Sequence, residues 1–127
     1  MSWDVVLFSS KEKIISLEAF DEEMLFPVDF DAGLLSHFKN VTQDKNHISV
    51  NGEGFSIDFF LDEEPESNKM LSLYGEKALF ALVIVAKAQG WQIYDSGVDA
   101  MIDLDNPSAN GYKNFKEYLN TVLKGME

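Results

Sequence analysis

The chain contains neither cysteine nor arginine among its 127 residues. Without cysteine there is no disulfide framework, no thiolate zinc site and no cysteine nucleophile. Without arginine the chain lacks the side chain that best matches the two oxygens of a phosphate group. These two absences exclude several large classes of metal-binding, redox and nucleic-acid-binding proteins.

Long hydrophobic runs are missing as well. The longest apolar run, Ala78 to Ala86, is far shorter than the roughly 20 residues that a membrane-spanning helix needs. The first residues, Met1 to Asp4, have no basic start, and the apolar residues Val5 to Phe8 are too few for the core of a signal peptide. We therefore expect a cytoplasmic protein with no membrane segment.

The charge is strongly negative, because 22 acidic residues face ten lysines and give a net charge of -12. Such a field disfavours contact with nucleic acids and with anionic lipid surfaces. Two interpretations are open: the charge serves solubility alone, or an acidic surface meets a basic partner. The length and the 46% hydrophobic content predict one folded domain over residues 1–127.

Hydrophobic periodicity predicts a mixture of strands and helices. Strands are expected at 3–8, 48–50, 55–61, 70–74 and 91–94, with a short extended piece at 101–104. Helices are expected after a cap at Asp31, at 77–89 and at 112–124. We expect Trp91 to be buried against the helix at 77–89. The predicted fold is α+β, with an antiparallel sheet of about five strands and two to three helices packed mainly on one face.

Motifs for catalysis or metal binding are incomplete. The chain has no Gly-x-Ser-x-Gly elbow, and its only histidines, His37 and His47, lack metal-ligand spacing. A calcium loop counted from Asp103 fails at its fifth position, which is Pro107. We therefore predict no metal, no cofactor and no enzymatic activity. An irregular calcium site along Asp99 to Asn106 is the alternative.

Two stretches, Glu18 to Asp31 and Asp62 to Glu66, concentrate the acidic residues. The first also contains large apolar residues, which either anchor the loop to the body or form an interface with the surrounding acids. If a protein partner exists, it should be basic. The candidate contact residues are Asp21, Glu22, Glu23, Asp62, Glu63 and Glu64.

Three motifs follow one another along the chain: Met1-Ser2-Trp3-Asp4, then Gly54-Phe55-Ser56-Ile57-Asp58-Phe59, then Gly90-Trp91-Gln92-Ile93-Tyr94-Asp95-Ser96. Over roughly Met1 to Asp105 they resemble a family of small bacterial proteins of uncharacterised function. The resemblance implies no activity that can be carried over. In size, charge and lack of a catalytic signature, the chain is also similar to the immunity proteins of bacterial toxin systems.

The sequence therefore predicts a non-enzymatic acidic interaction protein, in its most specific form an immunity-type inhibitor of a basic toxin. The alternative is a small-molecule-binding accessory or regulatory domain. A third hypothesis is an enzyme that uses Asp58 and Asp95. Asp58 is expected on the strand face opposite Ile57 and Phe59, and Asp95 ends a strand, where a carboxylate often caps a turn.

Overall fold

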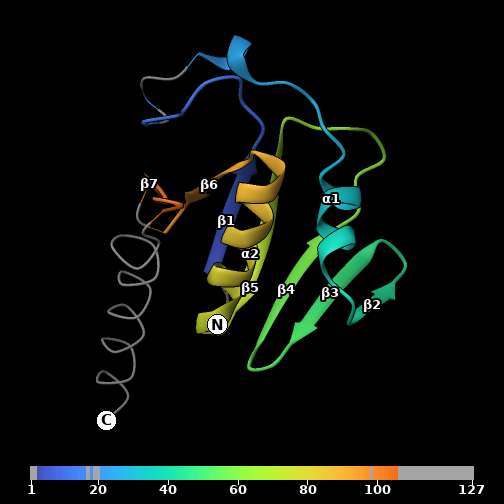
Figure 1. Ribbon diagram of the computed structural model, residues 1–127. Coiled ribbons are helices and arrows are strands. Elements are labelled where there is room, and N and C mark those ends of the chain that lie inside the picture. Colours follow the sequence, from blue (N-terminus) through green and yellow to red (C-terminus); the bar gives the residue numbers. More distant parts are fainter. Residues whose placement is uncertain (1–2, 17, 19–20, 98, 106–127) are drawn as a thin grey trace.

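A computed structural model describes residues 3–16, 18, 21–97 and 99–105. In these residues, seven strands form one antiparallel sheet in the order β2-β3-β4-β5-β1-β6-β7 (Figure 1). The strands are β1 (Trp3–Phe8), β2 (Val41–Asp44), β3 (His47–Gly52), β4 (Phe55–Phe60), β5 (Asn68–Tyr74), β6 (Gln92–Asp95) and β7 (Ala100–Met101). The helices are the 3-10 turn η1 (Glu22–Met24), α1 (Phe30–His37) and α2 (Glu76–Gln89).

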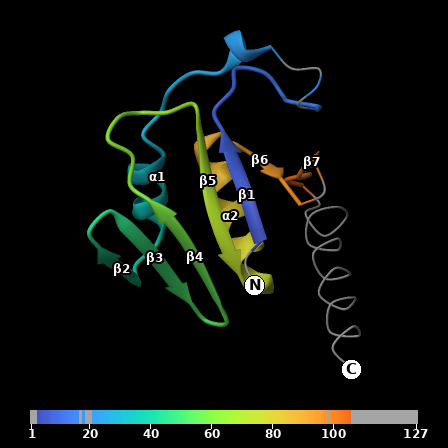
Figure 2. The same ribbon diagram turned by 180° about the vertical axis from the view of Figure 1, so that it is seen from behind.

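Alternation along the strands separates the two faces of the sheet. In the central strand β1, Val5 and Leu7 are fully buried, whereas Asp4 and Val6, which alternate with them, are only partly covered. The buried side chains meet α1 and α2, which lie side by side on one face, while Figure 2 shows the other face in front of α2. We call this second face, which neither described helix covers, the open face. Of the described helices, neither has the length and apolar character to cross a lipid bilayer.

The predicted α+β class with an antiparallel sheet is confirmed, but the sheet has seven strands rather than about five. The two extra strands, β2 and β7, lie at the sheet edges. β2 has a single apolar residue, Val41, and therefore shows no alternation, and it joins β3 through a turn in which Lys45 has a φ of 58°. β7 contains two residues only, too few for a periodic signal. The helix expected at 112–124 lies outside the described residues.

Helix α1 begins two residues earlier than expected, which corrects the role of Asp31. The cap is Asp29, whose side chain accepts a hydrogen bond from the backbone amide of Ala32 at 3.0 Å. Phe30, at the first helical position, is 1% exposed and enters the core. Asp31 therefore falls inside the first turn, on the side that faces the sheet.

Trp91 is buried, as expected, but its ring lies against α1. The ring centroids of Trp91 and Phe30 are 4.8 Å apart, and a Cβ atom on Gly33 would lie 2.5 Å from Cη2 of Trp91. Gly33 is thus the position at which the ring approaches the backbone of α1. Helix α2 is apolar along residues 78–86, yet it is not buried on every side, because Ile84 is 67% exposed.

The close approach at Gly33 predicts that Gly33→Ala destabilises the protein, although alanine favours a helix by about 1 kcal/mol. The added methyl group overlaps a rigid, buried ring, and such overpacking costs about 1 to 3 kcal/mol. Chemical denaturation of the variant should show a net loss of free energy of unfolding. In a Trp91→Phe background the overlap is relieved and the same substitution should be neutral or stabilising. An equal loss in both backgrounds would contradict this explanation.

Candidate functional site

A buried lysine stabilises the end of the sheet where the acidic loops lie. Lys69 is 4% exposed and occupies the same side of β5 as the core residues Leu71 and Leu73. Alternation places it there, because residues two apart along a strand share a face. A buried ammonium is costly unless it is paired. Sequence reasoning missed this residue, although its spacing from Leu71 was a visible signal.

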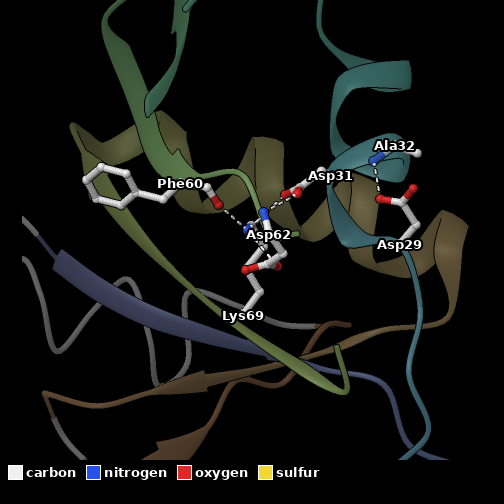
Figure 3. A network of polar contacts seen from close by, with 6 residues as sticks. All are labelled: Asp29, Asp31, Ala32, Phe60, Asp62 and Lys69. Atoms are coloured by element: carbon white, nitrogen blue, oxygen red, sulfur yellow. Dashed lines mark hydrogen bonds and ion pairs between the residues drawn. The ribbon is translucent and has the colours of Figure 1, made fainter. Parts of the chain in front are cut away.

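Three oxygen atoms surround the Lys69 ammonium (Figure 3). Nζ lies 2.8 Å from Oδ1 of Asp31 and 3.0 Å from Oδ2 of Asp62, and it donates to the backbone carbonyl of Phe60 at 2.5 Å. The second oxygen of Asp31 accepts a hydrogen bond from the backbone amide of Asp62 at 2.8 Å. The ammonium also lies 5.2 Å from the centre of the Phe59 ring. One side chain of β5 therefore ties together α1, the end of β4 and the loop that follows β4.

These contacts lie where the central pairing of the sheet stops. The paired register of β4 and β5 runs only from Ser56 and Tyr74 to Asp58 and Ser72. Beyond that point the ammonium of Lys69 reaches from β5 to the last residue of β4. Lys69 thus connects two strands past the end of their backbone ladder.

The two acidic stretches meet at this same end of the molecule. The backbone groups of Val28 and Glu66 bond reciprocally, with N–O distances of 2.9 and 3.1 Å. The amide of Phe26 donates to the carbonyl of Ser9 at 3.1 Å, which pairs the first acidic stretch with the chain that leaves β1. These contacts bring together two acidic stretches that lie about 40 positions apart along the chain. We call the surface formed by the described residues of these two stretches the acidic end.

The acidic end surrounds an open hollow of about 600 Å³. Apolar and polar residues both line it: Phe8, Leu25, Pro27 and Pro65 on the one hand, and Glu22, Glu66, Ser67 and Asn68 on the other. The described lining residues include no lysine, and both glutamates are exposed. The arrangement suits a group with an aliphatic body and a positive head.

The predicted contact residues occupy different places around this hollow. Asp21, Glu22 and Glu23 are exposed at η1, where Oδ1 of Asp21 accepts a hydrogen bond from the amide of Glu23 at 2.9 Å. Glu63 and Glu64 are exposed and line a second, smaller cleft of about 80 Å³ on the other side of Pro65. Asp62 lines that cleft too, but its carboxylate is held by Lys69.

The aromatic and aliphatic residues of the first acidic stretch divide between the two expected roles. Phe30 is buried in the core and anchors the stretch to the body. Phe26 is 38% exposed and stays on the surface of the acidic end. Met24 and Leu25 are half-buried. Phe20 lies outside the described residues. Two lysines, Lys11 and Lys13, flank the stretch on the chain that leaves β1, and both are exposed.

The two weaker polar candidates, Asp58 and Asp95, do not come together. Asp58 lies on the open face of β4, whereas Asp95 is 1% exposed and lies opposite the core residue Val5. Strands β5 and β1 separate them, which puts β4 and β6 about 14 Å apart at the usual strand spacing. Oδ1 of Asp95 accepts a hydrogen bond from the amide of Gly97 at 2.9 Å and caps that turn. The pair has neither the distance nor the common face that joint carboxylate chemistry requires.

The remaining titratable residues show no metal-binding arrangement in the part of the chain that the structure describes. In the stretch considered for calcium, Asp105 pairs with Lys87 at 3.1 Å and Asp99 accepts a hydrogen bond from Tyr94. Asn106 lies outside the described residues. His47 is beside Asp58, with Nε2 and Oδ2 3.7 Å apart.

Comparison of the chain with protein-family models, with curated proteins and with solved structures gives no match.

Loss of the buried ammonium should be costly because it leaves Asp31 charged and unpaired. We expect Lys69→Met to lower the free energy of unfolding by about 3 to 5 kcal/mol, the usual result of removing one partner of a buried pair. Adding Asp31→Asn should restore much of that loss, because the uncompensated charge is removed. Lys77→Met, at an exposed lysine, is the control and should change stability by less than about 0.5 kcal/mol. A double variant no more stable than Lys69→Met would contradict this account.

Tyr94 has an altered titration. Its hydrogen bond to Asp99, followed by burial and the nearby charges of Asp99 and Asp95, raises the pKa of Tyr94 from 10.0 to about 12. The raised pKa favours the neutral phenol in the folded state. Its contribution to stability is therefore complete below pH 10 and is lost as the pH rises through about 12.

Asp99→Asn should bring the pKa of Tyr94 back toward its ordinary value. Asparagine tolerates the positive φ of 51° at this position, so the turn is preserved while the charge is removed. Ultraviolet titration of tyrosinate, with Tyr94→Phe as the blank, measures the shift. An unchanged midpoint in Asp99→Asn would show that Asp99 does not control Tyr94.

Proposed function

We propose that this protein is a non-enzymatic interaction protein that binds a basic protein through its acidic end. The observation that carries the proposal is the meeting of two acidic stretches around one hollow that apolar side chains and two glutamates line together. Its most specific form is an immunity-type inhibitor that covers the basic surface of a toxin. The similarity in size and charge to such immunity proteins supports that form.

The chemistry of the hollow favours a lysine or arginine side chain from the partner. Such side chains place their methylene stems on apolar surface and keep the charged head near water or a carboxylate. Leu25 and Pro27 can contact the stem, and the exposed carboxylates of Glu22 and Glu66, which line the same hollow, can meet the head. The exposed acids of η1 and of Glu63 and Glu64 extend the negative field beyond the hollow.

The scaffold favours a preformed surface. The reciprocal bonds of Val28 and Glu66 join the two stretches, and the Lys69 network holds the second stretch against α1. A surface that is ordered before binding loses less conformational entropy when the complex forms. Charged rim residues then act mainly on the rate of association, because they steer the partner over long distances.

The second candidate function is a small-molecule-binding accessory domain. The observation that favours it is the volume of the hollow, about 600 Å³, which lies in the range of about 300 to 1,000 Å³ typical of ligand sites. Glu22 and Glu66 in its lining favour a cationic ligand with an apolar body. Equilibrium dialysis against small polyamines and aromatic amines separates this function from protein binding.

Charge reversal at the hollow tests the proposal. Proteins captured by the immobilised chain from extract of its native cell should be basic, and the purified partner should associate more slowly with Glu22→Lys. We expect a drop of about threefold to tenfold at 0.1 M salt, with little change in dissociation. The difference should shrink toward 1 M salt, where the Debye length falls from about 10 Å to about 3 Å. Neutralising Asp21, Glu22 and Glu23 together should have the same direction of effect.

The matched control is Glu53→Lys. Glu53 is an exposed glutamate in the turn between β3 and β4, at the opposite end of the sheet from η1 (Figure 1). Both variants change the net charge equally, so only the position of the charge differs. The proposal fails if the captured proteins are neutral or acidic, or if both variants slow association to the same extent.

A further inference from the structure

The open face carries more exposed apolar surface than a solvated sheet face needs. One face of an antiparallel sheet commonly faces water and is then lined by polar side chains. Here Phe60 and Met70 are each 63% exposed, and Tyr74 is 37% exposed. Large contiguous apolar surface on a soluble protein marks an interaction site more often than chance.

Met70 belongs to a row of side chains that crosses the strands. The register pairs Met70 with Val6, Val6 with Tyr94, and Tyr94 with Met101, so these four share one line across β5, β1, β6 and β7. Phe60 lies on the same face, two positions after Asp58 along β4. It pairs with His47 of β3, and the centroids of the two rings are 5.2 Å apart. We call Phe60, Met70, Val6 and Tyr94 the apolar row.

A second row, parallel to the first, consists of hydroxyls and carboxylates. The register aligns Thr42, Ser49, Asp58, Ser72 and Asp4 across five strands. The hydroxyl of Ser49 donates to Asp58 at 2.7 Å, and that of Ser72 donates to Asp4 at 2.9 Å. Neutral donors thus orient both carboxylates without cancelling their charge.

Lysine is absent from the described residues that the strands place on the open face. Asp4 forms no ion pair among the described residues, and Asp58 lies beside His47, with Nε2 and Oδ2 3.7 Å apart. The face therefore joins an apolar row to a negative row. A second copy of this chain would bring the same negative charges together, whereas a basic partner would neutralise them.

The open face also continues into the acidic end. Phe8 lies on this face, paired with Asn68 and Gln92 in the next line beyond Met70 and Val6. Phe8 and Asn68 both line the hollow. Phe8 is 8% exposed, whereas its partner Asn68 is exposed, so the hollow borders the open face chiefly at Asn68. A partner that enters the hollow can extend from there over the apolar row.

We propose that the open face is the docking surface for an amphipathic basic segment, whose apolar side covers the apolar row and whose cations meet Asp4 and Asp58. This inference rests on the proposed function, in that it deepens the contact with a basic partner. The acidic end steers the partner, and the apolar row retains it. The two surfaces should therefore control different rate constants.

The test uses a peptide of 14 residues made of leucine and lysine, with the leucines on one helical face. A second peptide has the same composition with its leucines distributed around the helix. Surface plasmon resonance on the immobilised full chain measures association and dissociation at 0.15 M salt. We expect the amphipathic peptide to dissociate from the unmodified chain about tenfold more slowly than the second peptide.

The double variant Phe60→Ser/Met70→Ser should remove that difference and leave association nearly unchanged. Both side chains are largely exposed, so folding should persist, and Met70→Ser alone should give part of the effect. Ile84→Ser is the matched control, because Ile84 is 67% exposed but lies on α2, on the covered side of the sheet. It should leave both rate constants as they are.

Three results would overturn the inference. They are unchanged dissociation from the double variant, an equal effect of Ile84→Ser, or a dimer in sedimentation that the double variant abolishes, which would assign the face to a second copy.

Glu22→Lys distinguishes the two proposals. If it leaves association of both peptides unchanged while the double variant accelerates dissociation, the acidic end does not steer and the docking surface stands. If Glu22→Lys slows association of both peptides while the double variant leaves dissociation unchanged, the proposed function stands and the docking surface is excluded.

Discussion

The buried ammonium of Lys69 is the interaction on which the acidic end depends. It lies at the position where the ladder between β4 and β5 has ended, and it contacts α1, the last residue of β4 and the loop after it. An apolar side chain at this site would pack against Leu71 but would offer nothing to the carboxylate of Asp31. Two carboxylates from distant segments of the chain, Asp31 and Asp62, thus contact one buried cation.

The two faces of the sheet carry different chemistry because of one backbone rule. Residues two apart share a face, so β5 places Lys69, Leu71 and Leu73 under the helices and Met70 and Ser72 on the open face. The covered face is closed by apolar packing around Phe30 and Trp91. The open face borders the hollow at the paired residues Phe8 and Asn68, which both line it.

Much of the fold could be predicted from local pattern, and the arrangement of the site could not. Alternation indicated β1, β4 and β5, and Gly90, with a φ of 77°, ended α2 where expected. The sequence also identified the two acidic stretches. It could not show that Val28 and Glu66 pair, because that contact depends on tertiary structure. Lys69 was missed since a lysine in a strand is usually exposed, and its burial requires Asp31 and Asp62 from distant parts of the chain.

The position of β1 in the sheet has a consequence for the order in which the molecule can assemble. β1 is the first strand of the chain, yet both of its neighbours, β5 and β6, come from residues 68–74 and 92–95. During synthesis β1 therefore has no strand partner until most of the sheet has been made. By contrast, β2, β3 and β4 can pair as consecutive hairpins. Closure of the sheet by β1 requires contacts between residues far apart in the chain, and such contacts form slowly. A nascent chain thus exposes an unpaired central strand for longer than any other strand, which makes this segment the natural target for chaperones and the point where misassembly would begin.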